Sequence, residues 1–476
     1  MKLYRWALSG LSMLAMMATS ISQDAYQIDV EVANATSDTL YLAYFYGDAQ
    51  YVRDTAYADD RGVFSFRGLE ALPYGVYIIV MPPANSFFQI LIDEDQSFRM
   101  TTDAQNVSGS TVIEGHEDNK VFYSYLALID GARKEKAILE QELEAATDEG
   151  IQTELDEKLT GLDKKVLQRQ NEILRDHPNS LSAMVIAASR EPTIPDFSHL
   201  PEEDRQMAAL QYYRNHYFDH IDLNREAILR TPFLHQKVMD FFDKYTSQVP
   251  DSLILAVDDF FGRIEDEGST IYRYFLVKLL NKYANPSIVG QDAVYVHLAQ
   301  QYYGQGKAPW VDEETLTKIL DNAERFKYTL IGNDAPPLQL YDVYKEQEVT
   351  LHDVKAPYKV LIFWSSTCNH CEKVMPTLPQ ILEEINDPTI RFITVCTKAD
   401  ESCKAFLDKN ALGDAGIHTL PVSAYGRLYD VRSTPKIFVI DGENKIASKG
   451  IGFNQIVEVI TMLKQNGNSA GTTSAN

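Results

Sequence analysis

Cysteine is scarce in this sequence, and the few cysteines lie close together. Only four occur among 476 residues, and all of them fall between positions 368 and 403. A small domain held together by disulfides would distribute its cysteines along the chain, so a disulfide scaffold is excluded as the fold class. The clustering instead predicts local cysteine chemistry in the last third of the chain.

Basic residues are also few relative to acidic ones. Lys and Arg together number 44 against 68 Asp and Glu, which gives a formal net charge of −24. Binding to the phosphates of a nucleic acid needs a basic surface. We therefore expect no nucleic-acid partner.

Long apolar runs are missing apart from one near the N-terminus. Lys2 and Arg5 precede an apolar run over residues 6–18, and small residues follow it. The run is shorter than the roughly 20 residues that a membrane-spanning helix needs, and this order of features is typical of a signal peptide. Residues 1–22 are therefore predicted to direct export to the periplasm or cell envelope, and no membrane span is expected after their removal.

The rest of the chain has an ordinary globular composition and enough length for about three domains, which predicts a multidomain α+β protein. In its first part, hydrophobic residues recur at every second position, with turn residues between the runs. This pattern predicts an antiparallel β-sandwich over residues 24–105. The alternating residues are Ile28, Val30 and Val32; Leu40, Leu42 and Tyr44; Phe64 and Phe66; Tyr77, Ile79 and Met81; and Phe88, Ile90 and Ile92.

Residues 116–330 have the hydrophobic period of α-helices and are predicted to form a helical domain. One stretch predicts an arm of a helical hairpin or short coiled coil, with the chain reversal at or near Gly150. We expect this domain to serve spacing and architecture rather than chemistry. The apolar residues of the predicted arm are Ile151, Leu155, Leu159, Leu162 and Val166.

Residues 332–465 return to strands that alternate with helices, in the predicted order β-α-β-α-β-β-α, which indicates an α/β domain. Residues 466–476 are small and polar and are predicted to form a disordered tail. The predicted strands cover 360–364, 391–396, 436–440 and 445–448; the predicted helices begin at Cys368 or cover 401–409 and 456–463.

Cys368 and Cys371 are the candidate redox pair, in the motif Cys368-Asn369-His370-Cys371. Cys368 follows a buried-strand pattern and opens a helix, where unpaired N–H groups and the positive end of the helix dipole stabilise a thiolate. Cys371 lies one turn later, close enough to form a disulfide with Cys368. A protonated His370 would stabilise the thiolate further. We predict that Cys368 is the attacking thiol and Cys371 the resolving thiol.

Five short segments around this motif carry a family resemblance. They are Ala335-Pro336-Pro337; Phe363-Trp364-Ser365-Ser366-Thr367-Cys368-Asn369-His370-Cys371; Met375-Pro376; Tyr429-Asp430-Val431-Arg432-Ser433-Thr434-Pro435; and Ile440-Asp441-Gly442. With them, residues 332–464 resemble the thioredoxin superfamily and, within it, the exported reductases of the TlpA and ResA type. The first 330 residues resemble, more faintly, the regions that precede some envelope thioredoxins.

The resemblance implies a thioredoxin-like α/β domain that exchanges disulfides through Cys368 and Cys371. It also implies a cis peptide bond between Thr434 and Pro435, with Pro435 beside Cys368. A cis bond before proline costs only about 0.5–1 kcal/mol over trans, so it is accessible at this position. Trp364, Asn369 and His370 are expected to support the site.

Three features depart from the family pattern. Ile362 stands where thioredoxin has a buried acid, and Val374 stands where ResA-type proteins have a glutamate. Proton transfer must then use another group or water. The pair Asn369-His370 replaces the Gly-Pro of thioredoxin and is closer to the more oxidising DsbA and protein disulfide isomerase sites. The direction of electron flow is therefore open.

Together these features predict an exported thiol-disulfide oxidoreductase that acts as a reductase, without cofactor or metal. Its partners would be protein thiols and disulfides of the cell envelope and an upstream redox protein. One alternative is a thioredoxin-fold peroxidase, although the proline and threonine that precede a peroxidatic cysteine are missing at suitable spacing. Another is a binding or scaffold protein whose thioredoxin domain is a passenger.

Cys396 and Cys403 leave two interpretations open. They would be bonded across the loop 397–402 if their Cα atoms lay within roughly 7 Å, and otherwise Cys396 would be a buried thiol. A zinc site built from all four cysteines is disfavoured, because structural zinc sites usually combine two short knuckles and these two cysteines have six residues between them. Neither residue is assigned to catalysis.

Overall fold

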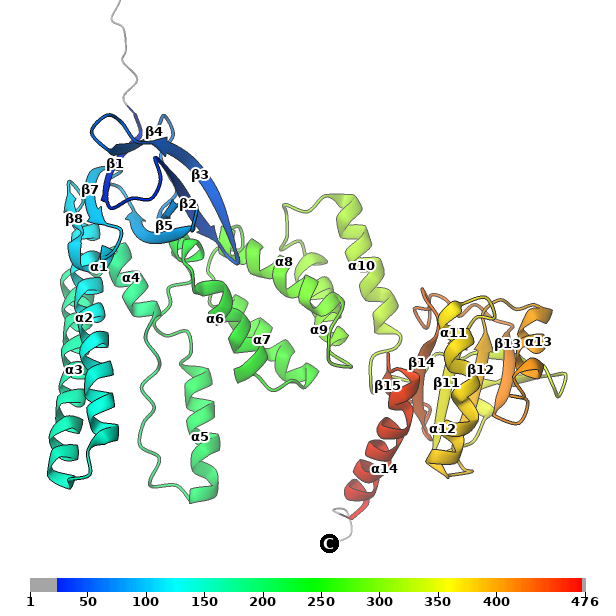
Figure 1. Ribbon diagram of the computed structural model, residues 1–476. Helices are drawn as coiled ribbons and strands as arrows, with labels where there is room; N and C mark the ends of the chain where they lie inside the picture. Colours follow the sequence, from blue (N-terminus) through cyan, green and yellow to red (C-terminus); the bar gives the residue numbers. More distant parts are fainter. Residues whose placement is uncertain (1–23, 473–476) are drawn as a thin grey trace, which may run out of the picture. The chain divides into compact units, whose positions relative to one another are not determined.

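The computed structural model describes residues 24–472 of the chain (Figure 1). The predicted signal peptide, residues 1–22, lies outside the described residues. The described chain divides into two compact units. The first unit contains residues up to 195 and 215–236, and the second contains 196–214 and the chain from 237 onward.

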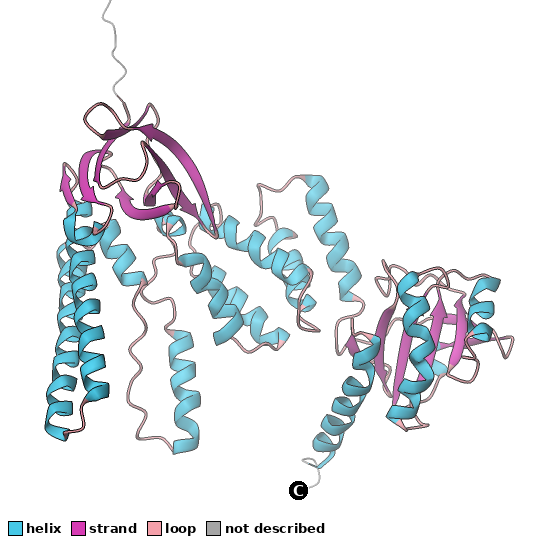
Figure 2. Ribbon diagram, viewed as in Figure 1, coloured by secondary structure: helices cyan, strands magenta, loops and turns pink. Residues whose placement is uncertain are grey.

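Two four-stranded sheets, drawn in magenta in Figure 2, form the β-sandwich of the first unit. The strands are β1 (Tyr26–Ala33), β2 (Thr39–Tyr46), β3 (Ala49–Tyr57), β4 (Val63–Gly68), β5 (Gly75–Met81), β6 (Ser86–Ile92), β7 (Ser97–Asp103) and β8 (Val112–Glu114). Their order is β4-β1-β7-β8 in one sheet and β3-β2-β5-β6 in the other. The residues predicted to alternate into the core are buried, except for half-buried Tyr44.

One strand pair departs from the predicted antiparallel arrangement. β1 and β7 run parallel, with Ile28 opposite Phe98 and Val30 opposite Met100. The other ladders of this sandwich are antiparallel. Alternation of apolar residues reports which face of a strand is buried but not its direction, so the sequence pattern could not reveal the parallel pair.

A helical hairpin follows the sandwich and confirms the predicted arm. The helices of this unit are α1 (Val107–Ser110), α2 (Glu117–Ala145), α3 (Glu149–Asp176), α4 (Leu181–Ala188) and the 3-10 helix η1 (Glu226–Arg230). Leu139 of α2 packs with Leu155 and Leu162 of α3. The chain reverses just before α3, where the Asp148 carboxylate accepts hydrogen bonds from the N–H groups of Gly150 and Ile151.

Helices also make up the middle of the chain, as predicted. They are α5 (Glu202–Asn215), α6 (Leu234–Asp240), α7 (Pro250–Gly262), α8 (Thr270–Ala284), α9 (Asp292–Leu298) and α10 (Glu313–Lys327), with π-helical turns η2 (Phe241–Tyr245) and η3 (Ala299–Tyr303). Their core is aromatic. Phe260 packs edge-to-face against Phe242 and Phe275, and all three side chains are completely buried.

The C-terminal part is an α/β domain around a seven-stranded sheet of order β10-β9-β13-β12-β11-β14-β15. Its strands are β9 (Gln339–Asp342), β10 (Gln347–Thr350), β11 (Tyr358–Trp364), β12 (Arg391–Cys396), β13 (Ile417–Pro421), β14 (Lys436–Asp441) and β15 (Ile446–Lys449). Its α-helices are α11 (Asn369–Val374), α12 (Leu378–Ile385), α13 (Glu401–Lys409) and α14 (Ile456–Thr472), with 3-10 turns η4 (Leu351–Asp353), η5 (Met375–Thr377) and η6 (Phe453–Gln455).

β11 lies inside this sheet and separates two hydrophobic cores. It pairs in parallel with β12 and antiparallel with β14. Ile362 and Trp364 face the core that α12 and α14 also line, whereas Leu361 and Phe363 face the opposite core. Burial on both faces explains the continuous apolar run from which this strand was predicted.

Three strands of the domain were not predicted, and each lacks a clear strand signal. β9 and β10 are only four residues long and are joined by a tight turn. β13 contains His418 and ends at Pro421, a residue that argues against a strand. The buried His418 ring is satisfied by Thr394 Oγ1 at 2.8 Å and by the Leu412 carbonyl at 2.7 Å.

The C-terminal helix is longer than expected. α14 continues to Thr472, whereas residues 466–476 were predicted to be a disordered tail. A helix that has already nucleated gains one hydrogen bond for each residue added, so it can extend into a polar segment without apolar anchors. Residues 473–476 lie outside the described part of the chain.

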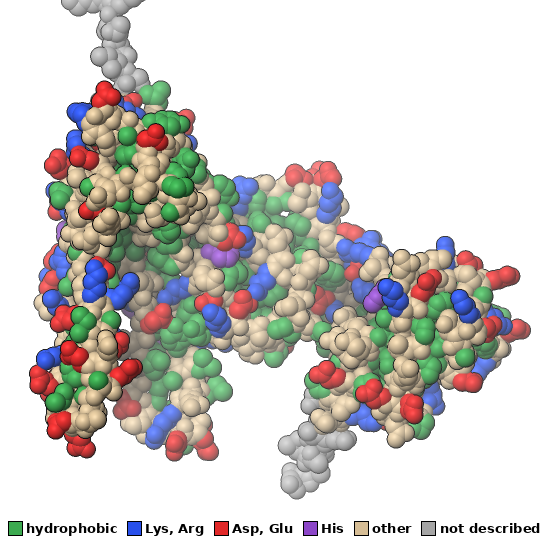
Figure 3. All heavy atoms as spheres, in the orientation of Figure 1, with side chains coloured by type: hydrophobic (Ala, Val, Ile, Leu, Met, Phe, Trp, Pro, Cys, Tyr) green, Lys and Arg blue, Asp and Glu red, His purple; other side chains and the backbone are tan. Residues whose placement is uncertain are grey.

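The surface carries acidic and basic side chains over all its visible parts (Figure 3). Acidic residues gather at the tip of the α2–α3 hairpin, where Glu142, Glu144, Asp148 and Glu149 are exposed. Between residues 24 and 472, no helix combines the length and apolar character needed to cross a membrane.

Gly416, just before β13, offers a test of this sheet. Its φ is +154°, and a Cβ at this position would lie 2.7 Å from the Phe392 carbonyl oxygen. Gly416→Ala should therefore lower the local free energy of unfolding by about 1–3 kcal/mol. Hydrogen exchange of the amide groups of β12 and β13 measures this change. Gly426→Ala is the control, because its Cβ would meet nothing within 4 Å. Equal effects of the two substitutions would contradict the close approach of Gly416 to Phe392.

Candidate active site

The candidate site is built at the end of β11, where the chain turns into α11. Cys368 is the N-cap residue of α11 and is half-buried, and its backbone N–H donates to the Ser365 carbonyl at 3.2 Å. Cys371 is one turn further along the helix and fully buried. Both are free thiols. The structure therefore gives the two cysteines the unequal access that the motif predicts.

The start of α11 favours ionisation of Cys368. The backbone N–H of Cys371 hydrogen bonds to the Cys368 sulfur and is the main cause that holds the pKa of this thiol below its ordinary value. The backbone N–H of His370 acts in the same direction. These are groups that a helix leaves unpaired in its first turn, so the helix itself supplies the stabilisation of the thiolate.

Cys371 has the opposite electrostatic character. Burial raises the pKa of its thiol to about 11, although the Ser365 backbone N–H partly opposes that rise. Cys371 therefore stays protonated at neutral pH while Cys368 is the more readily ionised of the two. This difference distinguishes a thiol that meets a substrate from a thiol that acts after it.

The segment before β14 forms the other wall of the site. The Thr434–Pro435 peptide bond is cis, as predicted. The Cys368 thiol donates a hydrogen bond to the Thr434 carbonyl oxygen at 3.2 Å. The structure thus confirms that the Thr-Pro step, 66 residues further along the chain, lies beside Cys368.

A buried carboxylate ties the two ends of this segment together. Asp430, which has a left-handed φ of 45°, accepts hydrogen bonds from Arg432 Nε at 2.6 Å and from Lys436 Nζ at 3.1 Å. Its side chain is only 9% exposed, so these charge-assisted bonds are poorly screened by water. Asp430 therefore restricts the segment that carries Thr434 and Pro435. Asp430 belongs to one of the five segments of the family resemblance, but no local pattern in the sequence predicts this role.

Trp364, the last residue of β11, lies in the core beneath the site. Its indole is completely buried and packs against the Phe406 ring at 5.1 Å between ring centres. Its carbonyl oxygen accepts hydrogen bonds from the Thr397 backbone N–H at 2.8 Å and from Thr397 Oγ1 at 3.0 Å. Trp364 therefore supports the site through packing and through its backbone.

Asn369 and His370 lie on the outer side of the first helical turn. Both side chains are exposed. The hydrogen bond that joins His370 to Cys368 comes from its backbone N–H. A charge on an exposed imidazole would be screened by solvent, so the predicted effect of a protonated His370 is smaller than that of the backbone.

Ile362 and Val374, which replace the acidic residues of the family pattern, lie in apolar surroundings. Ile362 is fully buried and half-buried Val374 packs against the same core as Cys371. The groups that act most on the pKa of Cys371, besides burial, are Ser365, Thr434 and Cys368, and none of these is a carboxylate. Deprotonation of Cys371 must therefore use a group other than the acids familiar from this fold, or water.

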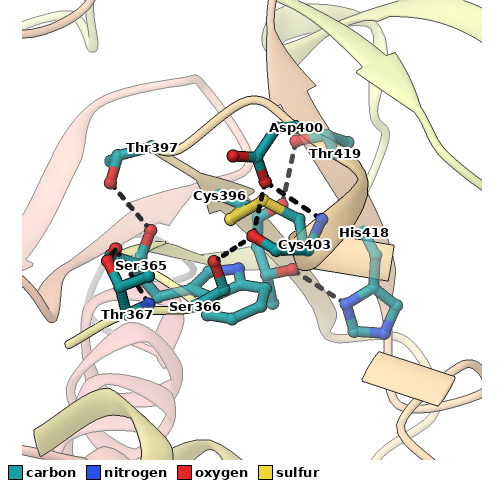
Figure 4. The surroundings of a disulfide bond; sticks show 12 residues. Ser365, Ser366, Thr367, Cys396, Thr397, Asp400, Cys403, His418 and Thr419 are labelled. Carbon is teal, nitrogen blue, oxygen red and sulfur yellow. Dashed lines mark hydrogen bonds between the residues drawn. A yellow bond between two sulfur atoms is a disulfide. The ribbon is translucent and has the colours of Figure 1, made fainter. Parts of the chain in front are cut away.

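Cys396 and Cys403 form a disulfide (Figure 4), and both lie in the same hydrophobic core as Cys371. Their Cα atoms are 6.1 Å apart, within the limit set for a bond, so the disulfide interpretation is confirmed and the buried-thiol one is wrong. The zinc interpretation loses two of its four ligands, because sulfurs joined to each other are not thiolates. Near this disulfide the hydroxyl groups of Ser366 and Ser402 are hydrogen-bonded to each other. The sequence does not predict this contact, because isolated serines carry no motif.

Known protein families match three successive regions of the chain. A model of the AhpC/TSA family matches residues 331–449, and two domains of unknown function match the preceding regions, DUF4369 at 26–122 and DUF5106 at 165–329. Curated relatives include the thiol-disulfide oxidoreductases ResA of Bacillus thuringiensis (strain Al Hakam) and Bacillus anthracis. Each is 28% identical over 126 residues, which cover 26% of this chain and 70% of the relative.

The C-terminal domain is a TlpA/ResA-like member of the thioredoxin superfamily. The predicted fold class is confirmed, and the chain is an oxidoreductase of the thiol-disulfide type. Solved structures with similarity include a thioredoxin-like protein from Bacteroides caccae, 17% identical with a TM-score of 0.44, which covers 57% of this chain and 98% of that one. A domain of a possible thiol-disulfide isomerase from Cytophaga hutchinsonii is 25% identical with a TM-score of 0.27 and covers 29% and 97%.

The unequal pKa values of the thioredoxin-like domain predict the pH dependence of its alkylation. The pKa of Cys368 is lowered, so its reaction with iodoacetamide should reach half of its maximal rate at a lower pH than that of an ordinary thiol. Cys371 should become reactive only as the pH approaches about 11. Mass spectrometry of peptides after timed alkylation measures both profiles. Equal profiles for the two cysteines would contradict the site geometry.

Proposed function

We propose that this chain is an exported reductase that opens disulfides of envelope proteins through Cys368 and Cys371. The observation that carries the proposal is the contrast between the two thiols. Cys368 is half-buried with a lowered pKa, and Cys371 is buried with a raised pKa. Export rests on the N-terminal sequence pattern, and the envelope proteins are proposed as clients because exported disulfides are found there.

The reaction follows from these two environments. The Cys368 thiolate attacks one sulfur of a client disulfide, so that a mixed disulfide forms and one client thiolate leaves. The Cys371 thiol then loses its proton and attacks the Cys368 sulfur, which releases the second client thiolate. The client has gained two electrons and, with the protons taken up by its two thiolates, two thiols. The domain is left with a Cys368–Cys371 disulfide, which an upstream dithiol protein must reduce.

The trapping experiment assigns the two roles. Cys371→Ser should accumulate a mixed disulfide with client proteins, because the first attack is intact and the resolving thiol is missing. Cys368→Ser should form no such adduct and show no turnover, since Cys371 is buried. Non-reducing electrophoresis of envelope extracts and an insulin-reduction assay measure the two outcomes. Trapping by Cys368→Ser at the rate of Cys371→Ser would reverse the roles, and full activity in both variants would exclude the enzyme interpretation.

The reduction potential tests the direction. The Cys368 thiolate is stabilised mainly by backbone N–H groups, and His370 is exposed, so the reduced state gains little from a nearby charge. We therefore expect a potential nearer to about −270 mV, as in thioredoxin, than to about −120 mV, as in DsbA. Equilibration with glutathione and with dithiothreitol brackets the value. A potential at the DsbA end would make the protein an oxidant instead.

Peroxidase activity is the second candidate, because the matching family model is that of the AhpC/TSA family. In that reaction a peroxide would oxidise Cys368 to a sulfenic acid, and Cys371 would condense with it to a disulfide and water. Consumption of hydrogen peroxide with dithiothreitol as the reductant distinguishes the two functions. A reductase should consume hydrogen peroxide slowly and reduce insulin quickly. A peroxidase should consume hydrogen peroxide quickly and reduce insulin slowly.

A further inference from the structure

We propose that the Cys396–Cys403 disulfide is a positioning device for the attacking thiol. It holds the loop 397–402, and this loop in turn holds the segment that leads from β11 to Cys368. The proposal rests on the role of Cys368 proposed above. It gives the Cys396–Cys403 disulfide a function in the reaction, although this disulfide does not itself exchange with client proteins.

The disulfide is placed where client proteins have no access to it. Cys396 ends β12 and Cys403 lies in the first turn of α13, and each residue is only 1% exposed. Both belong to the same hydrophobic core as Trp364 and Cys371. Exchange of a disulfide needs an approach of an outside thiolate along the S–S bond, which this burial prevents.

One link runs from the loop to the end of β11. Trp364 lies directly opposite Cys396 in the parallel β11–β12 ladder. The next residue, Thr397, donates two hydrogen bonds to the Trp364 carbonyl, from its backbone N–H at 2.8 Å and from its hydroxyl at 3.0 Å. The residue from which the chain leaves the sheet toward Cys368 is therefore fixed to the residue that follows the disulfide.

A second link joins the loop to the segment itself. The hydroxyl oxygens of Ser366 and Ser402 are 2.6 Å apart, and Ser402 directly precedes Cys403. The Ser402 hydroxyl also donates to the Asp400 carboxylate. Because a hydroxyl has one proton and an ionised carboxylate can only accept, Ser366 must be the donor to Ser402. Ser366 lies two residues before Cys368 in the sequence, so this bond restrains the segment that carries the attacking thiol.

The loop needs an external restraint to keep this arrangement. Ala399 has a φ of 55°, in the left-handed region that side chains with a Cβ disfavour. Figure 4 shows the disulfide above Ser365 and Ser366 in this view, with Thr397 and Asp400 on the loop that it closes. If the bond between the sulfurs is missing, the loop is free to leave the strained conformation, and both links loosen.

Loosening matters because the pKa of Cys368 depends on short distances. Its sulfur must stay near the N–H groups of His370 and Cys371, which stabilise the thiolate. The Ser365 carbonyl also accepts the Cys368 N–H at 3.2 Å, so a shift of this segment shifts the thiol. A role as a simple staple is weaker, since closing so short a loop restricts the unfolded chain less than closing a long one.

Two variants test the proposal in the full chain. Cys396→Ala/Cys403→Ala removes the disulfide without leaving a lone thiol, and Ser402→Ala keeps the disulfide but removes the hydroxyl link at an exposed position. The matched control is Ser423→Ala, which loses one hydrogen bond, to the Gln339 N–H at 3.1 Å, elsewhere in the same domain. The readouts are the pH profile of Cys368 alkylation and, separately, the rate of insulin reduction.

We expect both test variants to move the alkylation midpoint of Cys368 to higher pH. At pH 7 its alkylation should slow roughly fivefold in Ser402→Ala, the factor that corresponds to the net contribution of one hydrogen bond, and more in the double variant. The control should retain the profile of the unsubstituted protein. Unchanged Cys368 profiles in both test variants would overturn the proposal and leave the disulfide as a stabilising link. Alkylation needs no client, so a protein that shows the shift but reduces no disulfide would overturn the proposed function and not the positioning role.

Discussion

The register of β11 within its sheet is the constraint on which the whole redox site depends. β11 ends at Trp364, which lies opposite Cys396 of β12 on one side, while the preceding Phe363 lies opposite Lys436 of β14 on the other. β12 therefore places the Cys396–Cys403 disulfide beside the end of β11, and β14 places the segment with the cis Thr434–Pro435 bond there. A shift of one residue would turn Trp364 out of its core and separate all three parts.

Around that strand, backbone groups contact the Cys368 sulfur directly, and side chains hold those backbone groups in position. Backbone N–H groups at the start of α11 stabilise the thiolate of Cys368, and the Thr434 carbonyl accepts a hydrogen bond from its thiol form. Side chains such as Asp430 and Ser402 act further out and hold these backbone groups in place. A site built in this way tolerates the exchange of Asn369 and His370 for other residues more readily than a movement of the chain.

Sequence reasoning recovered the parts of this site that carry a local signal. The Cys368 and Cys371 motif, the cis Thr434–Pro435 bond and the buried strand before them each depend on a few adjacent residues. The disulfide between Cys396 and Cys403 could only be left open, because bonding depends on a distance that spacing does not determine. The hydrogen bonds of Asp430 to Arg432 and Lys436, and the Ser366–Ser402 contact, were not predicted, because they depend on strand register and loop conformation. In the same way, the parallel β1–β7 pair and the short strand β13 lack a pattern of their own.

The burial of Trp364 has a practical consequence for following the chemistry. Its indole lies in one hydrophobic core with Cys371, Cys396 and Cys403, so three of the four cysteine sulfurs belong to its surroundings. Disulfides quench indole fluorescence through short-range electron transfer, and thiols do so less. Within the described chain, Trp310 is the other tryptophan, and it packs against Tyr272 among the middle helices. We therefore expect the emission of Trp364 to fall when Cys371 enters a disulfide, which makes it an optical signal of the site that needs no label.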